Sequence, residues 1–150
     1  MLIRKESARF LSSSFVRRLS SKKDASMFAK LVLNRKDRPK RNLKLYVDWI
    51  AKMPIYGVFE GDSIVSYAGS FIQTPQIWMI GGVYTDPDQR NKGYASLATS
   101  AVTAEALKKA EMAALFVRSD NYAAIRVYEK IGYRKIGEKL WVDVGTGLKP

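Results

Sequence analysis

The chain of 150 residues contains neither cysteine nor histidine. Without cysteine it can form no disulfide, no thiolate zinc site and no cysteine nucleophile. Without histidine it lacks the side chain that most often serves as a general base or metal ligand near neutral pH. Aspartate and glutamate, the common metal ligands that remain, are sparse and scattered along the sequence. We therefore expect no metal site.

Long apolar runs are also missing, because no stretch approaches the roughly 20 residues that a membrane-spanning helix requires. We therefore expect a cytoplasmic protein with no membrane partner. The hydrophobic content of 47% and the aromatic content of 11% are those of a folded protein. The length is sufficient for a core without disulfides or metals. We expect an N-terminal extension over residues 1–14, with the potential to add an edge strand, and one domain over residues 15–150.

Acidic residues are scarce in the first third of the chain. Residues 1–50 hold 14 Lys and Arg against 4 Asp and Glu, whereas residues 51–150 hold 12 against 10. Such an excess is typical of contact with nucleic acid, an acidic surface or an anionic ligand, and also of a solvated basic face. Few aromatic residues lie among these cations and no known nucleic-acid motif is present. A nucleic-acid-binding module stays open as an alternative function.

The hydrophobic pattern changes from a helical period to a strand period and back along the chain. The expected elements are a strand over residues 15–19, helices over 22–33 and 43–52, strands over 55–60, 64–73 and 76–85, a helix over 96–112, a strand over 114–117, a helix capped by Asn121 and ended by Gly132, and a final strand or bent strand pair over 133–144. The three central strands form a meander. The strand–helix–strand order that follows implies a buried parallel pair with a right-handed crossover.

The most informative stretch is Val83–Ala95, where the third strand of the meander ends and an alanine-rich helix begins. A helix N-terminus offers unpaired backbone N–H groups and a partial positive charge, and both favour a bound phosphate. Gly93 has no Cβ, so the backbone can approach a ligand closely. Arg90 and Lys92 add cationic donors at the same place. An ordinary strand–turn–helix connection is the competing interpretation of this stretch.

The spacing Arg90-x-x-Gly93-x-Ala95 resembles the pyrophosphate-binding loop of the GNAT acetyltransferase superfamily, and the order of elements over about residues 15–143 is that of the family. A second part of the family signature follows in Asn121, Tyr128 and Gly132-Tyr133. The resemblance implies an α/β fold with a central mixed, mostly antiparallel sheet, splayed middle strands and about four flanking helices. It also implies acetyl-CoA as cosubstrate.

The resemblance assigns roles to individual residues. The residues expected to hold the pyrophosphate are Arg90, Asn91, Lys92, Gly93, Tyr94 and Ala95. The pantetheine arm is expected along the backbone of Val83 and Thr85 and near Asn121. Tyr128 is expected near the thioester sulfur, as the general acid for the departing thiolate.

The glycine pair Gly81-Gly82 interrupts an apolar strand and predicts either a bulge or a close backbone approach. Packing of these glycines against a bulky neighbour such as Trp78 is the alternative. If the strand bulges, a backbone N–H near Val83 would hold the oxyanion that develops on the thioester carbonyl.

The general base stays open. Many family members use a glutamate near the middle meander strand, and none lies between Gln73 and Tyr84. Glu60, Tyr84 acting through a water, and bulk water in the cleft are the candidates. Two interpretations follow: an N-acetyltransferase in which the amine attacks the thioester directly in a ternary complex, or a catalytically silent regulator that binds coenzyme A.

The acceptor amine is unknown, and a protein N-terminus, a lysine and a small amine are all compatible with the sequence. The resemblance places the connection between the first two helices at one wall of the acceptor cleft, and here that connection is the basic loop Arg35–Arg41. We therefore expect an acceptor that carries a negative group. Residues 1–14 or a second protomer are expected to cover the edge of the sheet beyond the final strand.

Overall fold

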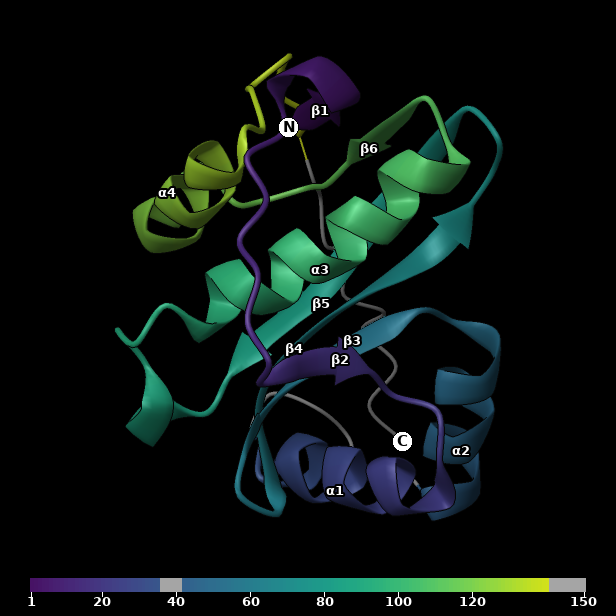
Figure 1. Cartoon of the computed structure of the whole chain (residues 1–150). Coiled ribbons are helices and arrows are strands. Elements are labelled where there is room, and N and C mark those ends of the chain that lie inside the picture. Colours follow the sequence, from purple (N-terminus) through teal and green to yellow (C-terminus); the bar gives the residue numbers. More distant parts are fainter. Residues whose placement is uncertain (36–41, 141–150) are drawn as a thin grey trace, which may run out of the picture.

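The computed structural model describes residues 1–35 and 42–140 (Figure 1). Six strands form one open sheet in the order β1-β6-β5-β4-β3-β2. The elements are β1 (Leu2–Arg4), η1 (Lys5–Ser7), β2 (Val16–Arg18), α1 (Lys22–Leu33), α2 (Leu43–Lys52), β3 (Ile55–Glu60), β4 (Ser63–Gln73), β5 (Ile77–Thr85), η2 (Pro87–Gln89), α3 (Tyr94–Lys109), β6 (Met112–Ala114) and α4 (Tyr122–Ile131). Only β5 and β6 pair in parallel. The expected mixed, mostly antiparallel sheet with flanking helices is confirmed.

The helices pack against the sheet in two groups (Figure 1). α3 and α4 enclose one core, which contains the buried Val102 and Ile131. α1 and α2 enclose a second core, which contains Phe28. Successive residues of β4 serve the two cores in turn, since Ile64 belongs to the second and Val65 to the first. This alternation follows from the two-residue period of a strand and places the two helix pairs on opposite faces.

Local signals in the sequence fix most helix ends. α1 begins after Ser21, whose Oγ accepts a hydrogen bond from the Asp24 N–H at 3.0 Å, and Asp24 completes a capping box. α2 begins after Asn42, whose side chain accepts from the Leu45 N–H. α4 ends at Gly132, where φ is +114°. The predicted helices over residues 22–33 and 43–52 are confirmed.

The structure corrects the expected order in the second half of the chain. β6 covers Met112–Ala114 instead of residues 114–117, because α3 ends at Lys109 and parallel pairing with Ile77–Met79 sets the position of the strand. The final strand expected over residues 133–144 is wrong in the described part of the chain. Arg134 forms an isolated bridge there, and residues 135–140 lie in no strand. Residues 141–144 lie outside the described residues.

The N-terminal segment pairs with β6 at this edge of the sheet. β1 is antiparallel to β6, and Leu2 exchanges two backbone hydrogen bonds with Arg134, at 2.9 and 2.8 Å. The chain after η1 then runs across α3 (Figure 1), where the Leu11 N–H donates to Ser100 Oγ at 2.7 Å. β1 therefore covers the outer side of β6 and leaves the side that faces β5 to the site described below. No helix in the described ranges is long and apolar enough to cross a membrane.

Candidate functional site

A β-bulge interrupts β5 in the middle of the sheet. Tyr67 pairs with Tyr84 and Gly69 pairs with Gly81, so β5 has one more residue than β4 between these pairs. Gly82 adopts a φ of +64°, which a residue with a Cβ reaches only with strain. The predicted bulge is confirmed. The extra residue leaves part of the β5 backbone without a ladder partner at this point.

β5 and β6 separate just before the bulge. β5 and β6 pair only over Ile77–Met79 and Met112–Ala114, whereas β5 continues to Thr85. The opening between them contains a cavity of about 230 Å³, which we call the splay cavity. Its walls are Arg35, Ile80, Gly81, Gly82, Val83, Phe116, Val117, Arg118, Asn121 and Tyr128. The expected splayed strands are confirmed, and the structure brings Val83, Asn121 and Tyr128 to one cavity.

Tyr128 presents its side chain to the splay cavity from α4. The residue is 7% exposed, and burial raises the pKa of its hydroxyl above the ordinary value. Its ring packs edge-on against Tyr133, with centroids 6.1 Å apart. Tyr133 uses its own hydroxyl in a buried hydrogen bond of 2.8 Å to Thr103. Tyr128 makes no such bond to the described residues, so its hydroxyl is available to a ligand in the cavity.

Asn121 is held by the start of α4. Its side-chain oxygen accepts a hydrogen bond from the Ala124 N–H at 3.2 Å and caps the helix. This bond fixes the residue at the rim of the splay cavity. Arg118, on the same rim, forms a two-point ion pair with Asp120, at 3.0 and 2.7 Å. No pattern in the sequence pointed to Arg118 and Phe116, because only the course of the chain after β6 places them here.

The turn before α3 presents free backbone donors. Gly93, with a φ of +80°, is the N-cap and supplies no side-chain cap, and nothing lies within 4 Å of the position that a Cβ would occupy. The first helical bond runs from the Leu97 N–H to the Gly93 carbonyl at 3.2 Å. Within the described residues, the N–H groups of Gly93, Tyr94 and Ala95 have no hydrogen-bond acceptor. These amides are the donors that a phosphate needs.

The two cations of this turn are held close to it. Lys92 Nζ donates to Gln89 Oε1 at 2.6 Å, and Arg90 Nε donates to the Thr85 carbonyl at 3.5 Å. Asn91 adopts a φ of +64°, which tightens the turn. Both cationic side chains therefore stay near the free amides and raise the local positive potential.

The two candidate bases lie apart from Tyr128. The Tyr94 hydroxyl donates to the Glu60 carboxylate, and this bond raises the pKa of Tyr94. Glu60 lines neither cavity described here. Tyr84 lies on the α1–α2 side of the sheet, with its ring 6.1 Å from the Tyr67 ring and 4.3 Å from the Arg35 guanidinium. The neighbouring Thr85 shares a hydrogen bond of 2.8 Å with Ser66.

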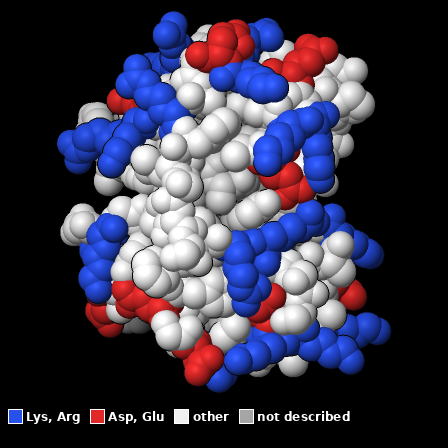
Figure 2. Space-filling view, in the orientation of Figure 1, with Lys and Arg blue, Asp and Glu red and all other residues white. Residues whose placement is uncertain are grey.

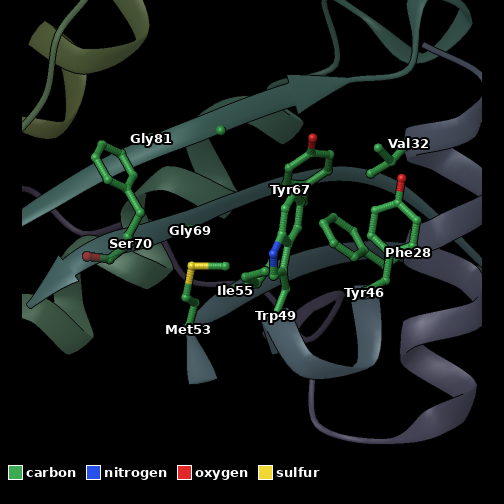
Figure 3. A pocket seen from close by; sticks show the side chains of 12 residues that line it. Phe28, Val32, Tyr46, Trp49, Met53, Ile55, Tyr67, Gly69, Ser70 and Gly81 are labelled. Atoms are coloured by element: carbon green, nitrogen blue, oxygen red, sulfur yellow. The ribbon is translucent and has the colours of Figure 1, made fainter. Parts of the chain in front are cut away.

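A second cavity, of about 110 Å³, opens on the α1–α2 side of the sheet and is here called the aromatic cavity (Figure 3). Figure 3 shows rings from α1, α2 and β4 directed toward one another across it. Its walls are Phe28, Val32, Tyr46, Trp49, Met53, Ile55, Tyr67, Gly69, Ser70, Phe71, Gly81 and Gly82. Gly81 and Gly82 thus line both cavities. The apolar faces of α1 and α2 were predicted correctly from the sequence, but the cavity between these faces and the sheet was not.

Charge does not gather into one surface on the face seen in Figure 2, where acidic residues are interspersed among the basic ones and an uncharged area lies between them. Three cations of the basic N-terminal third are ion-paired: Arg17 with Asp24 at 2.7 Å, Arg18 with Glu105 at 3.0 Å, and Lys23 with Asp62 at 3.3 Å. Residues 36–41 of the basic loop lie outside the described residues. The described residues contain no group of three or more His, Cys, Asp and Glu that could hold a metal ion.

Comparisons with known proteins give one consistent result. A family model described as FR47-like protein matches residues 55–142, more than half of the chain. A Novosphingobium aromaticivorans structure assigned to the GNAT acetyltransferases has 24% identity and a TM-score of 0.71 over 89% of this chain. This chain covers 57% of that protein's length. A comparison with curated proteins gave no match.

Two further structures contain ligands. A predicted acetyltransferase from Clostridium acetobutylicum, solved with acetyl-CoA, has 19% identity and a TM-score of 0.61, over 86% of this chain and 95% of that one. AAC(6')-Iy, solved with the bisubstrate analogue CoA-S-monomethyl-acetylneamine, has 13% identity and a TM-score of 0.70, over 85% and 95%. At these identities the likeness establishes the fold.

Proposed function

The chain belongs to the FR47-like family of GNAT acetyltransferases, and on this premise we propose that it is an N-acetyltransferase that transfers the acetyl group of acetyl-CoA to an amine. The observation that carries the proposal is the shared wall of the two cavities. Gly81 and Gly82, at the bulge of β5, separate the splay cavity from the aromatic cavity. A thioester reaching the bulge from one side would meet an amine reaching it from the other.

The residues of the splay side fit coenzyme A. The free amides of Gly93, Tyr94 and Ala95, with Arg90 and Lys92 beside them, suit a pyrophosphate. The edge of β5 that faces β6 is open beyond Met79, and there backbone groups of Val83 and Thr85 could meet the amide groups of a pantetheine arm, which would lie there like an added strand. Asn121 stands at the rim of the same cavity. Acetyl-CoA would supply an activated acyl group whose leaving group is a thiolate.

The bulge and Tyr128 would divide the chemistry between them. A backbone N–H near Val83, freed from the ladder by the bulge, would stabilise the oxyanion as the amine adds to the thioester carbonyl. Tyr128, with a raised pKa, stays protonated at neutral pH and would donate its proton to the departing thiolate. The ordinary thiol pKa of about 8.5 makes this thiolate a fair leaving group.

Within the described ranges no Asp or Glu lines either cavity, so these walls offer no carboxylate base. Glu60 is engaged by Tyr94 outside both. Tyr84 lies close to Arg35 on the aromatic side and could act only through water. We therefore assign the proton of the attacking amine to water in the open part of the cleft.

Two measurements test the proposal. Titration of the protein with acetyl-CoA should show binding. Coenzyme fragments that lack the pyrophosphate, such as pantetheine, should not displace acetyl-CoA. Thiol release with an amine panel should then exceed the rate without amine. Binding without amine-dependent thiol release would favour a catalytically silent regulator that binds coenzyme A. Absence of both binding and thiol release would contradict any role for coenzyme A.

Nucleic-acid binding through the basic N-terminal third has less support. Arg17, Arg18 and Lys23 are already paired with carboxylates, so they are less available to neutralise phosphates and release the counterions of a nucleic acid. An affinity for duplex or single-stranded nucleic acid that falls steeply with salt would restore this alternative.

A further inference from the structure

The aromatic cavity has a chemical character of its own. Three ring pairs stand edge to face around it: Phe28 with Tyr67 at 4.8 Å, Phe28 with Tyr46 at 5.7 Å, and Tyr46 with Trp49 at 5.7 Å between centroids. Such interlocked rings leave little freedom to rearrange. Aliphatic side chains of Val32, Met53 and Ile55 complete the walls. The cavity is therefore a preformed apolar compartment at the bulge.

A cation lies beside this compartment. Among the described residues no carboxylate lines it or the splay cavity, whereas Arg35 lines the splay cavity and contacts Tyr67 of the aromatic one. Arg35 donates a hydrogen bond to the Tyr67 hydroxyl at 2.9 Å and stacks 4.3 Å from the Tyr84 ring. An ammonium entering this compartment would lose water and meet a like charge. Both effects lower the pKa of an amine and favour its neutral form, which is the form that attacks a thioester.

The size of the compartment limits what can enter. An engineered apolar cavity of roughly 150 Å³ holds one benzene molecule, and the aromatic cavity has about 110 Å³ and is open on one side. The cavity is smaller than that benzene site, so it has room for at most one aromatic ring or branched aliphatic group, part of which would stay in the opening, with the amine directed toward Gly81 and Gly82. A long polyamine or a lysine side chain would bring few apolar contacts to these walls.

We infer that the acceptor is a small primary amine attached to one aromatic ring or a comparable apolar group, and that the aromatic cavity selects it and receives it uncharged. This inference rests on the proposed acetyl transfer. The amine nitrogen forms the bond to the acetyl carbon as the carbon–sulfur bond breaks. The sulfur leaves with the electron pair and takes a proton from Tyr128, the excess proton on nitrogen passes to water, and the Tyr128 phenolate regains a proton from water. The negative group expected from the loop Arg35–Arg41 is not required by this compartment.

A panel of amines with related carbon skeletons tests the inference. Benzylamine and 2-phenylethylamine supply one ring, phenylalanine adds a carboxylate to the same body, and spermidine and a lysine-containing peptide supply charged or extended amines. We expect kcat/KM for the two apolar amines to exceed that for spermidine and the peptide at least tenfold. Preference for the peptide or spermidine, with acetyl transfer intact, would overturn the inference alone. Preference for phenylalanine over 2-phenylethylamine would overturn it in favour of a negatively charged acceptor.

Variants connect the preference to the cavity. Val32→Phe fills the space from α1, and we expect a higher KM for the apolar amines with unchanged coenzyme affinity. Leu33→Phe is the matched control, since Leu33 is on the same helix, is 39% exposed and lies outside the cavity. Phe71→Ala, at a half-exposed position of the wall, gives a second test that does not depend on the core. Unchanged KM in both Val32→Phe and Phe71→Ala would overturn the assignment of this cavity. Loss of coenzyme binding and thiol release in the unmodified protein would instead overturn acetyl transfer itself.

The pH dependence offers an independent readout. Without a carboxylate base, the rising limb of kcat/KM with pH should follow the pKa of the acceptor amine. A ring-bearing amine made less basic by a β-fluorine should therefore reach its plateau at lower pH than its parent. A limb that stays at one pH for both amines would indicate a protein base and overturn this part of the inference.

Discussion

The ring of Phe71 lies directly on the backbone of Gly81, so that a Cβ added at Gly81 would clash with Phe71 Cε1. This contact joins the wall of the aromatic cavity to the bulge of β5. The contact explains why the strand carries glycine at residue 81. Residue 82 is glycine because its φ is +64°. The alternative expectation, packing against a bulky neighbour, thus holds at Gly81, but the neighbour is Phe71 and not Trp78.

Gly81→Ala should displace the Phe71 ring, because that half-exposed side chain gives way more easily than the strand. We expect kcat/KM for the acceptor to fall by about tenfold or more, the scale of a small misplacement at a reacting centre. Stability should change little. In the double variant Phe71→Ala/Gly81→Ala the clash is absent, so the two effects should not add. Strict additivity in steady-state kinetics would contradict the contact.

Gly93→Ala tests the phosphate site and has a matched control in Gly61→Ala. Both glycines have positive φ, +80° and +57°, and in both cases a Cβ would meet nothing within 4 Å. Each substitution should therefore cost a similar strain of roughly 1–2 kcal/mol. Only Gly93→Ala should weaken acetyl-CoA binding measured by calorimetry, because its backbone presents the free amides. Equal losses of affinity in the two variants would argue against a phosphate at α3.

The sequence predicted those parts of the molecule that depend on local signals. Ser21, Asn42 and Gly132 mark helix ends by chemistry that acts within a turn of helix. Gly81-Gly82 predicted the bulge in the same way. The match of Arg90, Gly93 and Ala95 to a known loop placed the amide donors at the start of α3.

Features set by distant pairing were beyond the sequence. The limits of β6 depend on Ile77–Met79, and the edge beside it is taken by β1 from the other end of the chain. The strand predicted over residues 133–144 is wrong in its described part because β1 occupies the edge beside β6. The aromatic cavity depends on how α1 and α2 pack against the sheet. In the sequence, its helical aromatic residues are indistinguishable from ordinary core positions. Roles for Tyr128, Glu60 and Tyr84 remain predictions for kinetics to decide.

Asp24 should link stability to acid pH. Its buried carboxylate accepts two bonds from Arg17, at 2.9 and 2.7 Å, and others from the Ser20 and Ser21 amides at 2.9 and 3.1 Å. The Arg17 bond is the largest cause that holds the pKa of Asp24 far below its ordinary value. A depressed pKa stabilises the fold above the unfolded value of about 3.9, and this stabilisation is lost as pH falls below it.

The corresponding variant is Asp24→Asn, which should lower the free energy of unfolding at pH 7 by about 2 kcal/mol, the scale of hydrogen bonds to a charged group. Chemical denaturation at pH 7 and pH 3 should show a smaller difference for the variant than for the unmodified protein. Asp62→Asn is the control, because its pair with Lys23 is exposed on both sides and such pairs contribute little. An unchanged pH dependence in Asp24→Asn would contradict the assignment.

Tyr128→Phe tests the proton donor with the least structural disturbance. The hydroxyl makes no hydrogen bond to the described residues, so its removal should leave the packing against Tyr133 and the stability of the fold nearly unchanged. Coenzyme affinity should also persist, whereas kcat should fall on the order of a hundredfold, the lower end for general acid catalysis. Because burial raises the pKa of Tyr128, the unmodified enzyme should keep its acid through neutral and mildly alkaline pH and lose activity only as pH rises through that raised pKa. The variant should lack this falling limb, and a variant that keeps both kcat and the limb would show that the proton reaches the thiolate from another source.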